Sequence, residues 1–85
     1  MHTFRKPRPN VIESDAGTIR ITGRAGLEVT YLGETVPVSS EMLAPPMSIA
    51  LFVSGSDSIP SPNADQILEF VKEGLQYAGF TVEVQ

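Results

Sequence analysis

Residues suited to acid–base or metal chemistry are scarce in this chain of 85 residues. Its one histidine is His2, and it contains no cysteine. A histidine-centred triad on the folded body and a thiolate metal site are therefore both excluded. Asp57 and Asp65 flank a predicted loop, but no ladder of calcium-binding oxygen ligands surrounds them. We expect no catalytic residue, no metal site and no cofactor, and we predict that the protein is not an enzyme.

Two stretches that contain glycine resemble phosphate or nucleic-acid clamps but lack their defining features. Residues 54–58 are rich in serine and glycine, yet they have neither the lysine nor the spacing of a P-loop, which favours an ordinary loop. Gly23 and Gly26 have the Gly-x-x-Gly spacing, with Arg24 between them. They separate two strand-like runs rather than two helices, so this spacing favours a turn.

The sequence from residue 63 to residue 79 predicts an amphipathic helix. Asn63, with Gln66 three residues later, matches a capping box, and Gly79 supplies the left-handed residue that commonly ends a helix. An apolar stripe within an arc of about 100° forms the face expected to pack on a sheet. Its members are Ala64, Ile67, Leu68, Val71, Leu75 and Ala78.

The candidate binding site lies beside that stripe, at Phe70 and Tyr77. The two aromatic residues either widen the buried face or form an exposed ridge, in which Gly74 leaves room for a partner's side chain. In the second interpretation, Glu69 and Glu73 border the ridge and attract a basic protein surface. Both interpretations remain open from the sequence alone.

Alternating apolar and polar residues predict four strands before the helix and one after it. The runs cover residues 18–22, 27–31, 36–38, 48–53 and 80–84. Gly33 and Glu34 indicate a hairpin turn, and Pro37 indicates an edge strand or a bulge. We therefore predict an α+β fold with a mainly antiparallel five-stranded sheet in the order β-β-β-β-α-β, and with one helix packed on one face.

A sheet with one helix leaves its opposite face uncovered, and Phe52 is a second candidate for partner binding there. The residues expected on that face are Leu32, Ala50 and Phe52, among Arg20, Glu28 and Glu83.

Acidic and basic residues are distributed unevenly along the chain. Residues 1–24 hold five basic and two acidic residues, whereas residues 25–85 hold eight acidic residues and Lys72 alone, for a total of −4. An acidic body disfavours nucleic acid and favours basic partners, although moderate acidity also simply maintains solubility. We predict that residues 1–10 form a flexible basic leader that adds little to stability, and that residues 11–85 form a single domain.

No apolar run of the length found in signal peptides follows the basic N-terminal residues. The longest apolar run, residues 49–53, is far shorter than the ~20 residues that cross a bilayer. Small secreted domains usually contain disulfides, so the absence of cysteine favours the cytoplasm. We expect a soluble, cytoplasmic protein that does not bind membranes.

Residues 20–28 and 40–42 resemble segments of a small family of bacterial immunity proteins from polymorphic-toxin systems, the immunity protein 74 family. Residues 67–69, Gly79 and residues 82–84 fit the end of that family, and the similarity covers residues 11–85. The family's loop before the helix often carries a tryptophan. This chain has residues 56–62 there and no tryptophan, so no role is transferred to that loop.

The resemblance implies a cytoplasmic protein that binds and neutralises a cognate toxin, without catalytic residues. The alternative is a small structural or regulatory subunit that associates with itself, as a homodimer for example, through an edge strand or the open sheet face. A nucleic-acid binder that uses residues 1–10 is disfavoured, because the rest of the chain is acidic.

Overall fold

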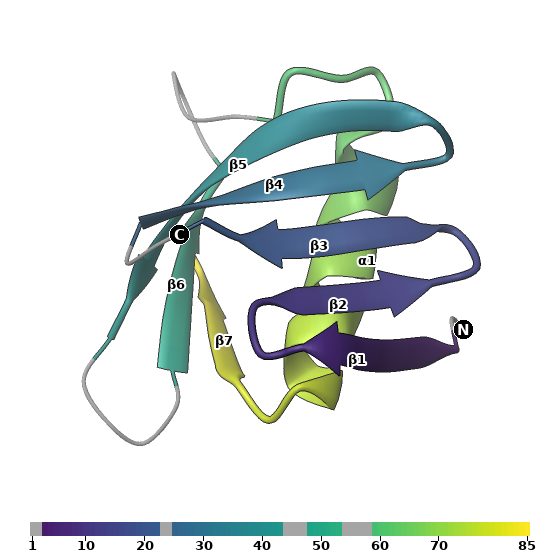
Figure 1. The fold of residues 1–85 in the computed structure, drawn as a ribbon. Coiled ribbons are helices and arrows are strands. Elements are labelled where there is room, and N and C mark those ends of the chain that lie inside the picture. The colour runs from purple at the N-terminus through teal and green to yellow at the C-terminus, as the bar shows by residue number, and fades with distance from the viewer. Residues whose placement is uncertain (1–2, 23–24, 44–47, 54–58) are drawn as a thin grey trace.

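A computed structural model gives the fold and describes residues 3–22, 25–43, 48–53 and 59–85 (Figure 1). Within these ranges the chain forms seven strands and one helix. In chain order they are β1 (Phe4–Arg8), β2 (Val11–Ser14), β3 (Gly17–Ile21), β4 (Ala25–Tyr31), β5 (Glu34–Met42), β6 (Ser48–Phe52), α1 (Ala64–Tyr77) and β7 (Thr81–Val84). No helix in the described ranges is both long enough and apolar enough to cross a membrane.

The strands form one sheet in which each strand lies beside its neighbours in the sequence, from β1 to β7. The pairs from β1–β2 to β5–β6 are antiparallel. β6 and β7 are parallel, because α1 crosses over between them. The predicted α+β class is confirmed, whereas the predicted number of five strands is wrong and the sheet is mixed.

The sheet curls around α1, which lies against its concave side (Figure 1). The long strand β5 supports the curl, because residues 34–38 pair with β4 alone and residues 39–42 pair with β6, while Glu41 also pairs with Ala25 of β4. Pro37 lies in the part of β5 that β6 does not reach, so its missing N–H costs no ladder hydrogen bond there. Leu32 and Gly33 both have positive φ, as a two-residue type I′ turn requires, and they join β4 to β5.

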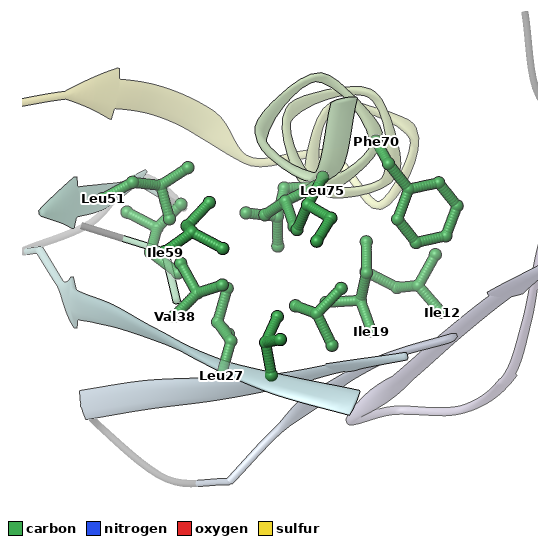
Figure 2. Close-up of a cluster of buried hydrophobic side chains, with 13 residues drawn as sticks. Ile12, Ile19, Leu27, Val38, Leu51, Ile59, Phe70 and Leu75 are labelled. Atoms are coloured by element: carbon green, nitrogen blue, oxygen red, sulfur yellow. The ribbon is translucent and has the colours of Figure 1, made fainter. Parts of the chain in front are cut away.

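The core fills the space between α1 and the concave face (Figure 2). Inward residues alternate along the strands, and the helix contributes the stripe that its periodicity predicts. The buried members are Ile12, Ile19, Leu27, Val29, Val36, Val38, Ile49, Leu51, Ile59, Ile67, Phe70, Val71 and Leu75. The three other residues of the predicted stripe, Ala64, Leu68 and Ala78, pack against this cluster and are partly buried.

The two ends of α1 differ in how well the sequence predicts them. Asn63 occupies the N-cap position, but its side chain makes no capping hydrogen bond, so the predicted capping box does not form. Instead the Ser61 hydroxyl accepts a hydrogen bond from the Asn63 N–H (3.1 Å) and donates one to Glu34 (2.7 Å), which ties the helix start to β5. At the other end, Gly79 has a φ of 98° and stops the helix as predicted.

The predicted flexible leader is wrong for residues 4–8, which form β1 on the edge of the sheet. Phe4 is the inward residue of this strand, and its ring centroid lies 5.6 Å from that of Phe70. The sequence does not reveal this strand, because its one inward apolar residue is followed by basic residues and proline, so apolar and polar residues do not alternate. β2 was likewise not predicted, although Ile12 and Ser14 are both buried.

Candidate functional site

The five candidate residues occupy three different environments. Phe70 is 0% exposed and belongs to the core, whereas Tyr77 is 55% exposed. Glu69 is exposed and Glu73 is half-buried on the outward side of α1. Phe52 lies on β6, where it is half-buried and pairs with a serine of β5. The structure therefore brings together Glu69, Glu73 and Tyr77, and it separates them from Phe70 and Phe52.

Phe70 does not form an exposed ridge. Its ring centroid is 5.0 Å from that of Tyr31 and 5.6 Å from that of Phe4, so aromatic rings from β4 and β1 contact it. Gly74 does not leave room for a partner either, because a Cβ there would clash with Ile19 Cδ1 and lie 3.1 Å from Phe4 Cε1. The glycine instead allows α1 to approach the sheet closely.

Tyr77 is the exposed end of a row of aromatic rings. Its ring centroid is 5.9 Å from that of Phe4, which in turn contacts the buried ring of Phe70. Tilted ring pairs at these distances attract one another. One side of the Tyr77 ring is therefore fixed against the body of the protein while the remainder is accessible to a partner.

Asp65, Glu69, Glu73 and Tyr77 are spaced four residues apart along α1, and we call this row the α1 ridge. Residues at this spacing are neighbours on a helix surface, so the four side chains form one continuous row. Asp65 lies in the first turn, where the helix dipole favours a negative charge. The spacing of four residues is visible in the sequence, but there Asp65 was interpreted only as a residue that borders the preceding loop.

Lys72 is the single basic residue of α1 and pairs with one carboxylate of the ridge, Glu69. Its Nζ lies 3.4 Å from Glu69 Oε1, and the Glu69 side chain is 64% exposed. An exposed pair of this kind is screened by water and contributes little to stability. Three carboxylates against one ammonium leave the helix with a net negative charge.

The outer face of the sheet is a weaker candidate than the sequence predicted. Leu32 is not on this face, because it lies in the β4–β5 turn, where it is 66% exposed. Ala50 is 1% exposed, with Glu41 of β5 and Glu83 of β7 as its cross-strand neighbours. Phe52 is the predicted apolar residue that stays partly accessible there.

A shallow hollow of about 350 Å³ lies between β4 and β5 on the outer face. Gly26 and small side chains such as Thr35 and Ser39 create it, and Glu28 is the one ionisable residue in the lining that the structure describes. The Arg20 guanidinium is 3.8 Å from that carboxylate. A single carboxylate beside hydroxyl groups does not provide the paired acid and base that hydrolytic chemistry uses.

Metal ligands do not converge in the described ranges, where no group of three His, Cys, Asp or Glu side chains is positioned to hold an ion.

Comparison of the chain with models of protein families, with curated proteins and with solved structures found no match. The α1 ridge combines three carboxylates with an exposed aromatic ring on one described surface.

Proposed function

We propose that this protein is a non-catalytic binding module that neutralises a cognate bacterial toxin by docking its α1 ridge on a basic surface of that toxin. The observation that carries the proposal is the row of three carboxylates ending in a half-exposed tyrosine that is held from behind by Phe4. Interface hot spots are enriched in tyrosine and lie inside a polar rim, and a half-exposed tyrosine bordered by carboxylates matches that arrangement.

A rigid tyrosine loses little conformational freedom when a partner covers it, so more of the contact energy remains as affinity. Phe4 holds the Tyr77 ring, and α1 is anchored along its length by Ile67, Val71 and Leu75 in the core. The ridge is therefore presented in one geometry before binding.

Charge supports a basic partner for the ridge. The chain has a formal charge of −4, and residues 25–85 hold eight acidic residues against one lysine. A field of this sign steers a positively charged protein towards the ridge and raises the association rate at low ionic strength. The similarity of residues 20–28 and 40–42 to immunity proteins supplies the class of partner, a toxin encoded next to the immunity gene.

The proposal is tested by measuring binding of this chain to the product of the toxin gene adjacent to its own gene. Tyr77→Ala should raise the Kd about 30-fold, which corresponds to the ~2 kcal/mol lost at an interface hot spot. Glu69→Gln combined with Glu73→Gln should slow association and flatten its dependence on salt, because the steering charges are removed.

Leu32→Ala is the matched control, since Leu32 is an exposed apolar residue of the β4–β5 turn and not of α1. It should leave the Kd unchanged. Equal Kd values for the wild type and for both ridge variants would overturn the ridge as the binding surface. A genome without a toxin gene beside this one would contradict the proposed class of partner.

A further inference from the structure

The sheet has two edges, and β7 forms the one next to the end of α1. β7 pairs with β6 in parallel, and no strand of the described ranges pairs with its other side. Residues 81–85 include Val84, which is 44% exposed. An edge strand of this kind offers its backbone to another chain.

Hydrogen bonds to β6 identify which backbone groups of β7 face outward. The Gln85 N–H donates to the Leu51 carbonyl (2.8 Å), and the Gln85 carbonyl accepts from the Val53 N–H (3.1 Å). Peptide groups alternate in direction along a strand, so every second residue before Gln85 also faces β6. The N–H and C=O groups of Val82 and Val84 therefore point to the open edge.

The opposite edge, β1, carries features that block strand addition. It contains Arg5, Lys6, Pro7 and Arg8, and its register with β2 shifts between Arg5 and Arg8. Charges, proline and irregular pairing are the means by which natural sheets protect their edges. β7 has one charged residue, Glu83, and no proline, so apart from its short length of four residues it lacks this protection.

We propose that β7 is a docking strand at which a second copy of this chain adds its own β7 in antiparallel orientation, with the two Val82 residues opposite each other. The outward N–H and C=O groups of Val82 then bond to those of Val82 in the second copy. The Val84 N–H of each copy donates to the Phe80 carbonyl of the other. The two sheets become one continuous sheet across a twofold axis.

Side chains select this register. With the Val82 residues opposite each other, Glu83 faces Thr81 of the second copy, and Val84 faces the partly buried ring of Phe80. Pairing of a β-branched with an aromatic residue is favourable in an antiparallel sheet. A register shifted to place Glu83 opposite Glu83 would bring two carboxylates together, which is unfavourable.

This inference is independent of the α1 ridge, because it rests on the backbone groups of β7 and uses no residue of α1. Each copy carries a formal charge of −4, so the two copies repel each other over long distances. Salt screens that repulsion. The proposed dimer should therefore strengthen as salt is added, whereas binding of a basic partner to the ridge should weaken.

Sedimentation equilibrium of the full chain from about 10 μM to about 1 mM, at low and high salt, tests the proposal over the range of weak strand-mediated association. Dimerisation that increases with salt is expected, together with slowed hydrogen exchange of the Val82 and Val84 amides on dimerisation. A chain that remains monomeric at the highest concentration in high salt would overturn it. If addition of the toxin, but not dimerisation, slowed the hydrogen exchange of these amides, β7 would bind the toxin rather than a second copy of the chain.

Three variants test the strand and its register. Val84→Pro removes an outward N–H that pairs with no strand of the described ranges, and it should abolish the dimer with little change in the circular dichroism spectrum. Thr81→Lys should lower the Kd of the dimer roughly 2- to 30-fold, because the twofold axis creates two pairs between the introduced lysine of one copy and Glu83 of the other. Thr81→Glu should raise the Kd by a similar factor, because both pairs then bring two carboxylates together. Thr81 is exposed, so neither change disturbs the monomer. A dimer insensitive to all three variants would place the interface elsewhere.

Discussion

Phe70 and Tyr77 project from nearly the same side of α1 into opposite environments. Phe70 is 0% exposed and Tyr77 is 55% exposed, although the ring of Phe4 contacts both. Seven residues of an α-helix return to within about 20° of the starting direction. The difference therefore arises along the helix axis: Tyr31 of β4 also covers Phe70, while Tyr77 lies in the last turn beside the edge strand β1.

Under the proposed function, this aromatic pair combines a structural role for Phe70 with a binding role for Tyr77. Phe70 packs between the helix and the sheet, and the ring of Phe4 contacts both Phe70 and Tyr77. Removal of the inner ring should then affect folding, and removal of the outer ring should affect binding. Variants along this row separate the two roles, in order of their expected effect on stability.

Phe70→Ala should have the largest effect, a loss of about 3–5 kcal/mol in the free energy of unfolding, because it opens a cavity at a fully buried site. A small domain has about 5–15 kcal/mol in total, so much of the variant should be unfolded near body temperature. Urea denaturation followed by circular dichroism measures the loss. Phe70→Leu, which retains most of the volume, should lose less than about 1.5 kcal/mol. Similar costs for both variants would mean that the site is not tightly packed.

Phe4→Ala should have an intermediate effect, a loss of about 1–2.5 kcal/mol, because Phe4 is half-buried and contacts two rings. The melting temperature should fall by about 4–8 °C for each kcal/mol lost. Lys6→Ala, an exposed change in the same strand, is the control and should shift it by very little. An unchanged melting temperature in the Phe4 variant would show that residues 4–8 behave as the flexible leader that the sequence predicted.

Tyr77→Ala should have the smallest effect on folding, less than about 1 kcal/mol, because more than half of the side chain is already exposed and alanine favours the helix. Thermal unfolding measures it beside the wild type. A loss as large as that of Phe70→Ala would place Tyr77 in the core and remove the proposed division of roles.

The sequence predicted the elements whose signals are local. Gly33 marked the β4–β5 turn, Gly79 marked the helix end, and the stripe containing Val71 marked the buried side of α1. The turn lies one residue earlier than predicted, at Leu32 and Gly33. These features depend on positive φ or on helical periodicity, both of which residue types reveal directly.

The sequence did not predict the features that depend on distant contacts. β1 has four charged or proline residues after Phe4, so its pairing with β2 leaves no apolar alternation. A helical wheel gives Phe70 and Tyr77 almost the same direction and contains no information on where the sheet ends. For that reason the sequence left open whether the two rings widen the buried face or form an exposed ridge, whereas one ring is buried and the other is exposed. Asp65 was not recognised as part of the row of carboxylates along α1.

The most direct test of the proposed role of the α1 ridge is an NMR titration of isotope-labelled protein with its unlabelled toxin. The largest chemical-shift changes are expected at Asp65, Glu69, Glu73 and the ring of Tyr77, with small changes at Phe52. Saturable changes centred instead on Phe52 and the outer face of the sheet, with the Tyr77 ring unaffected, would contradict the proposed role.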